Sequence, residues 1–516
     1  MTLHKYLKTY FGYDHFQEGQ EEIIRDVLRG EDILGILKTG SGKSLCYQLP
    51  ALMLDGLTIV VSPLISLMLD QVREMKALHV KRVAALHSLQ SKEERQMILN
   101  NLRKFKILFV SPEILQQRSL IHYLIRCEIS LFVVDEAHCI SQWGYDFRPD
   151  YLRLKTVINQ LGDPPILALT GTATPQVQQD IMLHLNRQNM KKHIYQMDRY
   201  NISLLVEQLH DEEAKRRRLI ELLQIVNRPT IIYFSSRKLA EQFATFIRNH
   251  VPNRQVAYYH GGMDPIDRLK IQQQFMHDQI DIICSTSAFG MGINKRNIRF
   301  VIHYHLPTQI DSYIQEIGRA GRDGKESVSV LLYREGDEQL PYSIIENEVP
   351  NEEELHVVFR QLYRLYKEEK RLPEKEVDIE AYFQIDETKW RLISFHLEQN
   401  GIIFQDKIRY SKEDWEQTFQ QLIHFRNERL KIKRAEIDEM KTWVNSTSCL
   451  RNGLYERFKQ PIEQKKKQCC SNCGFSFQTW LNSDDVKQKR QITNSWQEKL
   501  AFILQIGDKH ETSGNY

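Results

Sequence analysis

LFVVDEAH, residues 131–138, is an apolar run that ends abruptly in two carboxylates and a histidine. A short apolar run followed directly by charge predicts a strand buried on both faces, with Asp135 and Glu136 at its carboxyl end. Open α/β sheets bind ligands at this end of their strands. There Asp135 could hold a magnesium ion, and Glu136 could orient and deprotonate a water that attacks a γ-phosphate. A strand end capped by solvated acids would look the same, so the prediction depends on a phosphate-binding loop elsewhere.

A candidate for that loop lies upstream, in the segment KTGSGKS at residues 38–44. It follows a short apolar run and opens onto a helical pattern, which is the strand, loop and helix context that phosphate binding requires. Glycines let main-chain amides approach phosphates, the lysine supplies charge, and the last hydroxyl can ligate magnesium. The usual motif starts with glycine where this chain has Leu37, so a flexible surface loop is the alternative for this segment alone. The nucleotide-binding residues that we expect here are Thr39, Gly40, Gly42, Lys43 and Ser44.

Short apolar runs alternate with helical patterns along roughly the first 340 residues, in two successive blocks. Such alternation predicts parallel sheets covered by helices. The second block has no glycine-lysine loop and ends in QEIGRAGRDG at residues 315–324. Arg319 and Arg322 share one face of that segment if it is helical, and arginines across a cleft from a phosphate loop can stabilise a transferring γ-phosphate. Unpaired surface arginines are the alternative. We expect these two arginines to complete a catalytic site with Lys43, Asp135 and Glu136.

Length and composition limit the classes of protein to which this chain can belong. At 516 residues the chain predicts three or four domains, and 41% hydrophobic with 27% charged residues is typical of a soluble globular protein. No apolar run approaches the roughly 18 residues that span a bilayer, and the start has no signal-peptide core. We therefore expect a cytoplasmic protein without a membrane partner, nucleoid-associated if bacterial. A net charge of +3 does not by itself indicate nucleic acid.

Several motifs, in a fixed order along roughly the first 330 residues, resemble those of superfamily 2 helicases and, within them, RecQ-type DNA helicases. The segments that carry the resemblance are Phe11–Tyr13, Gly19–Glu21, Thr39–Tyr47, Ser62–Met68, Val110–Glu113, Asp135–Trp143, Phe147–Pro149, Ala288–Ile293 and Gln315–Gly324. The resemblance implies an α/β fold with two tandem RecA-like lobes that bind ATP and magnesium between them.

The resemblance also implies roles for single residues. Gln20 would read the adenine, Ser44 and Asp135 would hold magnesium, and Thr172 would relay the nucleotide state. A loop matching the family's aromatic-rich loop would couple DNA contact to hydrolysis, and His138 would bridge the lobes. The DNA-coupling residues are Trp143, Phe147, Arg148 and His138.

That loop has a rationale of its own, because exposed aromatic rings beside arginines stack on single-stranded bases. Rings packed beneath a long loop are the alternative. The chain departs from the family where Gln17-Glu18 replace Arg-Pro, Tyr145 replaces histidine, Gly171 replaces alanine and Asn294 replaces an acid.

Beyond the two lobes, residues 343–412 predict three helices and a small hairpin, which together look like a winged helix. A structural spacer is an equal alternative. As a DNA module it would place Lys389, Arg391, Lys407 and Arg409 near phosphates. The charged amphipathic stretch at residues 414–443 predicts a pair of helices.

Four of the eight cysteines gather near the C-terminus, as Cys449, Cys469, Cys470 and Cys473. RecQ proteins carry a four-cysteine zinc subdomain at this place, so the resemblance implies a structural zinc ion held by four thiolates. The spacing is irregular, because Ser476 occupies one usual cysteine position and Cys469 would have to serve instead. A cluster of free thiols is the alternative. About forty residues follow, which is too few for the helicase-and-RNase-D C-terminal (HRDC) domain of longer relatives.

We therefore expect a short RecQ-type DNA helicase that uses ATP, Mg²⁺ and structural Zn²⁺. It would move 3′ to 5′ on single-stranded DNA and unwind partly duplex DNA in recombination or repair, with DNA-repair proteins as candidate partners. The alternatives are an RNA helicase of the same superfamily and a non-unwinding clamp or annealing factor that uses ATP as a switch. The expected domains are lobe 1 (1–205), lobe 2 (206–342), the winged-helix-like module (343–412), the zinc subdomain (413–478) and a partly disordered tail (479–516).

Overall fold

The structure of the chain is a computed structural model that describes residues 2–141, 148–290, 295–373, 376–404, 407–459 and 468–482. Residues 1–475 form one compact unit, and the short helix α21 (Phe477–Leu481) belongs to a second. Among the described residues, no helix has both the length and the apolar character that crossing a membrane requires.

The first lobe is built on a seven-stranded parallel sheet with strand order β3-β4-β2-β5-β6-β1-β7. Its strands are β1 (Ile33–Ile36), β2 (Leu57–Val61), β3 (Val83–Leu86), β4 (Ile107–Val110), β5 (Ile129–Val134), β6 (Ile166–Thr170) and β7 (Lys191–Ile194). Its helices are α1 (Leu3–Phe11), α2 (Gln20–Leu28), α3 (Leu45–Met53), α4 (Ile65–Ala77), α5 (Lys92–Asn100), α6 (Pro112–Leu115), α7 (Arg118–Leu124), α8 (Pro149–Leu152), α9 (Leu154–Gln160) and α10 (Pro175–His184), with short 3-10 turns at Leu102–Lys104 and Ala137–Ile140.

Strand β5 explains why the apolar run is continuous. Phe132 and Val134 pack in the hydrophobic cluster on one face of the sheet, whereas Leu131 and Val133 pack in the cluster on the other face. Successive side chains of a strand point to opposite faces, so a strand covered on both sides must be apolar at every position. The run ends at Val134, where the strand ends and the carboxylates begin.

The second lobe repeats this architecture with a six-stranded parallel sheet in the order β10-β11-β9-β12-β13-β8. Its strands are β8 (Ile202–Gln208), β9 (Thr230–Tyr233), β10 (Val256–Tyr259), β11 (Ile282–Ser285), β12 (Phe300–His303) and β13 (Ser327–Tyr333). Its helices are α11 (Glu212–Ile225), α12 (Arg237–His250), α13 (Pro265–Met276), α14 (Ile310–Ile317) and α15 (Gln339–Glu348). The lobe boundary expected between residues 205 and 206 falls inside β8, which pairs with β13 of the second sheet.

After the second lobe come the three helices and the hairpin that the sequence predicts. They are α16 (Glu352–Lys367), α17 (Glu376–Phe383), α18 (Glu387–Gln399) and the antiparallel pair β14 (Ile403–Phe404) and β15 (Lys407–Ile408). A hydrophobic cluster of their own, which includes Leu362, Trp390 and Leu397, holds them together. This group is called the C-terminal module below.

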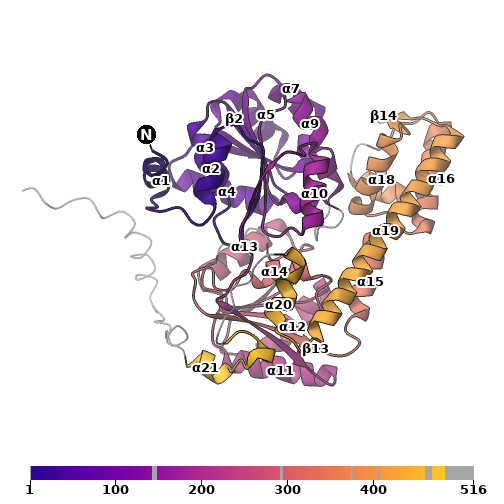
Figure 1. Cartoon of the computed structure of the whole chain (residues 1–516). Coiled ribbons are helices and arrows are strands. Elements are labelled where there is room, and N and C mark those ends of the chain that lie inside the picture. Colours follow the sequence, from indigo (N-terminus) through magenta and orange to yellow (C-terminus); the bar gives the residue numbers. More distant parts are fainter. Residues whose placement is uncertain are drawn as a thin grey trace, which may run out of the picture. The chain divides into compact units, whose positions relative to one another are not determined.

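The pair of helices expected at residues 414–443 is wrong, because α19 (Lys412–Val444) is one continuous helix (Figure 1). The segment contains no glycine or proline that would break it, and Ser411 caps its start by accepting a hydrogen bond from the amide of Asp414. Trp415 packs in the core of the C-terminal module, whereas Trp443 packs in the main core that includes the second lobe. Different tertiary contacts at its two ends stabilise a helix that looks like two in the sequence.

The cysteine-bearing segment is attached to the second lobe. Helix α20 (Leu450–Tyr455) continues into a 3-10 turn (Glu456–Phe458), and a second such turn spans Ser471–Cys473. Leu204 of the edge strand β8 donates from its amide to the carbonyl of Cys469 at 3.1 Å, and the Ser203 hydroxyl donates to the carbonyl of Gln468 at 2.6 Å. The segment thus covers part of an edge strand that would otherwise expose unpaired main-chain groups.

Candidate active site

The segment 37–44 forms a tight loop between β1 and α3. Gly40 and Gly42 have positive φ angles of 91° and 68°, which side-chain-bearing residues rarely adopt. A Cβ atom on Gly40 would lie 3.3 Å from both Arg199 Nη1 and Arg322 Cγ. Arginine side chains thus lie close against the loop at Gly40, and the positive φ there favours glycine.

Gln20 is buried beside this loop. Its side-chain amide donates to the carbonyls of Ser41 at 2.8 Å and Gly42 at 3.0 Å, and its oxygen accepts from the amide of Gln17 at 2.9 Å. Gln20 thus shapes the loop. The contact between Gln20 and adenine stays a prediction.

Lys43 and the two carboxylates meet at the carboxyl end of β5. Lys43 Nζ lies 3.3 Å from Glu136 Oε1, and the amide of Glu136 donates to Asp135 Oδ1 at 3.0 Å. Glu136 has left-handed backbone angles, with φ 48° and ψ 50°, which is an uncommon and strained conformation for a residue with a side chain. The strain at Glu136 is typical of a residue whose side-chain direction matters for function.

The charges around Asp135 and Glu136 favour a bound cation. Burial, followed by the charge of Glu136, raises the pKa of Asp135 to about 6. Burial also acts to raise the pKa of Glu136, but the nearby charges of Lys43, His138 and Arg319 outweigh it, so this pKa is lowered. Glu136 therefore stays ionised, and a hard cation such as Mg²⁺ would relieve the repulsion between the two carboxylates.

The second lobe contributes arginines from the turn that follows α14. Arg319 is buried and donates to the carbonyl of Gly290, and its charge acts on Glu136. Burial, together with the charges of Arg319 and Arg199, lowers the pKa of Arg322. A Cβ atom on Gly318 would lie 3.3 Å from Cβ of Thr39, so this turn packs directly on the phosphate loop. Several crowded positive charges form a site that a polyphosphate would stabilise.

The structure thus brings Lys43, Asp135, Glu136, Arg319 and Arg322 to one junction between the lobes, with Thr39, Gly40, Gly42 and Ser44 in the loop beside them. Arg199, which no sequence motif marked, reaches the same place from the segment between the lobes.

His138 contacts Thr170 Oγ1 at 2.8 Å and Glu136 Oε2 at 3.4 Å, and both partners belong to the first lobe. Thr170 in turn donates to the carbonyl of Thr172 at 3.0 Å. These contacts connect Glu136 to the turn after β6. The bridging of lobes by His138 and the relay through Thr172 stay predictions.

Gly171 lies where the phosphate loop and the turn after β6 meet. A Cβ atom there would lie 3.1 Å from Thr39 Oγ1 and 3.6 Å from Lys43 Nζ. Glycine in place of the usual alanine therefore leaves room beside Lys43.

The predicted DNA-coupling loop is only partly visible. Trp143 and Phe147 lie outside the described residues, as do residues 291–294. Arg148 follows that loop and donates from Nη1 to the carbonyl of Pro63 at 2.8 Å, while its amide donates to the carbonyl of Cys139 at 2.9 Å. The end of the loop is therefore anchored directly to the turn after β5.

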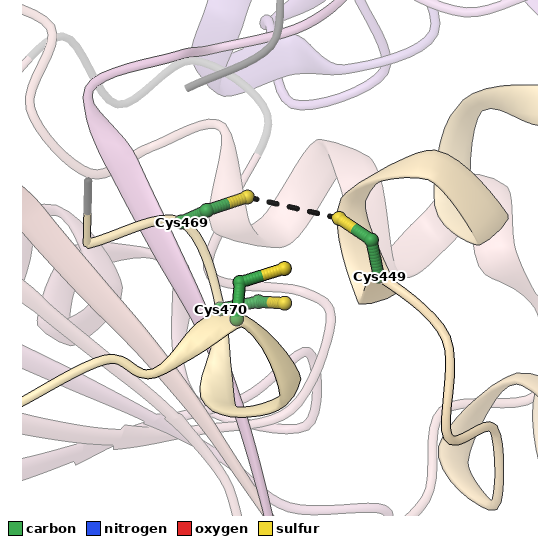
Figure 2. A group of neighbouring side chains, drawn as sticks. Cys449, Cys469 and Cys470 are labelled. Carbon is green, nitrogen blue, oxygen red and sulfur yellow. Dashed lines mark hydrogen bonds between the residues drawn. The ribbon is translucent and has the colours of Figure 1, made fainter. Parts of the chain in front are cut away.

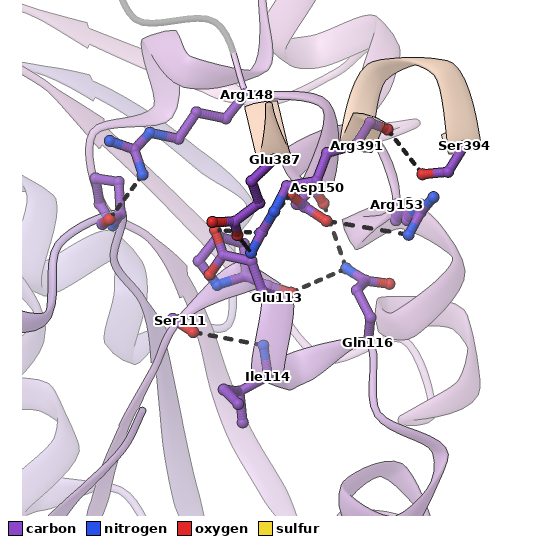
Figure 3. Close-up of polar contacts among 12 residues, drawn as sticks. Ser111, Glu113, Ile114, Gln116, Arg148, Asp150, Arg153, Glu387, Arg391 and Ser394 are labelled. Carbon is purple, nitrogen blue, oxygen red and sulfur yellow. Dashed lines mark hydrogen bonds and ion pairs between the residues drawn. The ribbon is translucent and has the colours of Figure 1, made fainter. Parts of the chain in front are cut away.

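Two of the four cations expected near phosphates in the C-terminal module pair with carboxylates. Arg391 Nη1 lies 3.1 Å from Glu113 and 3.2 Å from Asp150, both in the first lobe, as Figure 3 shows. Lys389 is buried and pairs with Glu354 at 2.7 Å. These pairs hold the module together and dock it on the first lobe. Lys407 and Arg409 are exposed in the hairpin region.

Cys449, Cys469, Cys470 and Cys473 come together as the sequence predicts. Their sulfur atoms all lie within 4.8 Å of one another, and Figure 2 shows the sulfurs of the three labelled cysteines gathered in one place. The Sγ atoms of Cys449 and Cys469 are 3.8 Å apart. Tetrahedral zinc with Zn–S bonds of about 2.3 Å places sulfurs about 3.8 Å apart, so the residues present fit this ion.

Comparisons with known proteins give a consistent result. A family model described as DEAD/DEAH box helicase matches residues 17–181, and one described as helicase conserved C-terminal domain matches residues 214–324. The chain is 41% identical over 507 residues to the probable ATP-dependent DNA helicase RecS of Bacillus subtilis, with 98% of each chain covered. It is 44% identical over 333 residues to the ATP-dependent DNA helicase RecQ of Haemophilus influenzae, which covers 64% of this chain and 53% of that relative.

Solved structures show the same fold at low identity. The helicase Lhr of Mycobacterium smegmatis, bound to single-stranded DNA and AMP-PNP, aligns with a TM-score of 0.56 at 16% identity over 90% of this chain and 63% of that one. The DEAD-box helicase Mss116, bound to single-stranded RNA and UDP-BeF, aligns with a TM-score of 0.56 at 16% identity over 94% of both chains.

Proposed function

Because the chain belongs to the RecQ family of ATP-dependent DNA helicases, we propose that it hydrolyses ATP where its two lobes meet and thereby moves 3′ to 5′ along single-stranded DNA and unwinds duplex DNA. The observation that carries the proposal is the convergence of Lys43, Glu136 and the Arg319–Arg322 turn, from three separate motifs, at one junction. From family membership alone, we propose a role in DNA recombination or repair in the cytoplasm, with DNA-repair proteins as candidate partners.

In the proposed reaction Lys43 exchanges partners. Without nucleotide its ammonium group pairs with Glu136, and a bound γ-phosphate would compete for it. That exchange leaves Glu136, whose lowered pKa keeps it ionised, to orient a water and accept its proton. ATP binding would therefore both position the phosphate and free the base.

Ser44 and Asp135 are the residues that would hold magnesium. An ion held there would supply positive charge that offsets the charge of the phosphates during transfer. Arg319 and Arg322 would stabilise the remaining charge from the opposite lobe, which makes catalysis depend on how closely the lobes approach. Hydrolysis and product release would then let the lobes separate and change the grip on DNA.

We propose that the four cysteines hold a structural zinc ion. The fit of the sulfur positions supports this. The ion would join α20 to the segment that pairs with β8. The zinc ion would thereby stabilise the attachment of this segment to the second lobe.

The experiment that tests the proposed function is strand separation on short duplexes with a 3′ tail, a 5′ tail or no tail. We expect ATP-dependent unwinding of the 3′-tailed DNA, and a stronger stimulation of hydrolysis by DNA than by RNA strands. Lys43→Ala should bind the same DNA without unwinding it. Binding without strand separation by the wild-type protein would identify a clamp, and preferential stimulation by RNA would identify an RNA helicase. Either result would overturn the proposal.

A further inference from the structure

Arg199 lies in the short segment between β7 and β8 that joins the two lobes, and its guanidinium group sits between the phosphate loop and the turn that carries the catalytic arginines. We propose that Arg199 is a positioning residue that sets the distance between these two loops and so controls the closed, hydrolysing geometry. The inference rests on the proposed ATP hydrolysis at this junction.

The contacts of Arg199 reach both lobes. Its Nη1 donates to the carbonyl of Thr39 in the phosphate loop at 2.8 Å and to the carbonyl of Gly318 at 3.0 Å. Its Nη2 donates to the carbonyls of Ala320 at 3.1 Å and Gly321 at 2.7 Å. One nitrogen is thus shared between loops of different lobes, while the other binds only the arginine-bearing turn.

This arrangement requires arginine. The guanidinium group is planar and presents its N–H donors in a fixed fork, so it can hold four carbonyl oxygens in one defined geometry. Lysine has the same charge, but its single nitrogen offers three donors and cannot reach carbonyls on both arms of the fork. The loops are therefore held by geometry as well as by charge.

The segment that carries Arg199 is itself fixed from the far side. Asn201 Nδ2 donates to the carbonyls of Gly321 at 2.9 Å and Lys325 at 2.8 Å. Arg451, a fully buried residue of α20, pairs with Asp198 and donates to the carbonyl of Arg199 at 3.3 Å. Three of the four side-chain hydrogen bonds of Arg199 named above are to the second lobe, so Arg199 would stay with that lobe when the lobes separate, and of these four bonds only the one to Thr39 would break.

The consequence is a contact that forms on closure without touching the nucleotide. When Arg199 meets Thr39, the turn bearing Arg319 and Arg322 is brought to a fixed distance from the phosphate loop. Phosphate binding by Lys43 and the loop amides does not require this contact, but transition-state stabilisation from the second lobe does. Arg199 should therefore affect turnover far more than ATP binding.

The first experiment compares Arg199→Lys with a matched control, Arg254→Lys, in the full-length protein. Arg254 is also buried and also donates to several main-chain carbonyls of the second lobe, including that of Val226 at 2.7 Å, but at the amino end of the sheet. We expect Arg199→Lys to lower the DNA-stimulated kcat by about ten- to a hundredfold, with the Kd for a non-hydrolysable ATP analogue changed less than about threefold. Arg254→Lys should lower the melting temperature without changing kcat.

A second experiment distinguishes positioning from general loss of structure. Kcat is measured for Arg199→Lys, for a variant with both Arg319→Ala and Arg322→Ala, and for the variant that combines all three substitutions. If Arg199 acts through the arginine-bearing turn, its substitution should lower kcat by less than about twofold once both arginines of the turn are absent. If the substitutions instead lower kcat by independent factors that multiply, the inference is overturned. It is also overturned if Arg199→Lys has the wild-type kcat. An inactive wild-type protein would instead refute the proposed function itself.

Discussion

Replacing Glu136 by Gln should strengthen ATP binding while stopping hydrolysis. The carboxylate of Glu136 currently holds the ammonium group of Lys43 at 3.3 Å. The amide of glutamine has nearly the same shape but neither attracts Lys43 strongly nor accepts a proton from water. The two effects act on different steps, so a single substitution should move affinity and turnover in opposite senses.

The size of each effect follows from the geometry. At 3.3 Å and an effective dielectric constant of about 20, a pair of unit charges attracts by about 5 kcal/mol, which is an upper bound for a partly solvated pair. If about a third of this is released to the phosphates, ATP binds about ten- to twentyfold more tightly. Loss of the general base should slow hydrolysis by about a hundredfold or more.

The assay measures both quantities on the same preparation. Binding is followed with a fluorescent ATP analogue in the presence of Mg²⁺, and hydrolysis by phosphate release with and without single-stranded DNA. Glu128→Gln, at the amino end of the same segment, is the matched control, because Glu128 is exposed and far along the strand from Lys43. Weaker nucleotide binding by Glu136→Gln would show that Glu136 does not compete with the phosphates for Lys43, and turnover at the wild-type rate would show that Glu136 is not the base.

Three further substitutions test the parts around the site. Arg457 Nη1 lies 3.1 Å from Asp311 and its Nη2 lies 3.2 Å from Glu436, and burial raises the pKa of both carboxyl groups. A carboxyl group whose pKa is higher in the folded than in the unfolded protein makes the folded state less stable as the pH rises. Because the charge of Arg457 offsets this effect, Arg457→Met should lower the melting temperature by about 5 °C at pH 8 and by less at pH 5.5. Cys470→Ser should reduce bound metal from about one zinc ion per chain to a trace, measured by elemental analysis. Arg391→Ala should speed hydrogen exchange in α8 and α18, because it removes the ion pairs that dock the C-terminal module on the first lobe.

Each of these three has a contradicting outcome. A melting difference for Arg457→Met that is the same at both pH values would mean that the carboxylates do not titrate as described. Full metal content in Cys470→Ser would remove that cysteine from the ligand set. Unchanged exchange after Arg391→Ala would show that other contacts hold the module in place.

Most of the residues that meet at the junction between the lobes could be predicted from the sequence, because they lie in local patterns. A strand, a glycine loop and a helix start are adjacent in the chain around Lys43, and an apolar run leads straight into Asp135 and Glu136. The alternation of apolar runs with helical patterns likewise predicts both parallel sheets. The family motifs then linked the two lobes, which periodicity alone would have left as separate domains.

The rest depends on contacts between distant segments. Arg199 acts on main-chain carbonyls, which carry no side-chain signature, so no pattern in the sequence marks its partners. Lys389 and Arg391 look like DNA-binding cations until folding brings Glu354 and Asp150 beside them. The continuous helix α19 is stabilised by packing at both ends, which a local pattern cannot reveal.

The proposed mechanism requires loops from both lobes to form one catalytic site, and an engineered disulfide between Thr39→Cys and Gly318→Cys tests this requirement. A Cβ atom on Gly318 lies 3.3 Å from that of Thr39, close to the roughly 3.5–4.5 Å that disulfides span, and Gly318 has a φ of −61° that any residue adopts. We predict that mild oxidation of the double variant forms this intramolecular bond and stops DNA-stimulated ATP hydrolysis, and that reduction restores hydrolysis, whereas neither single variant responds. Failure to form the bond, or undiminished hydrolysis with the bond in place, would contradict the account.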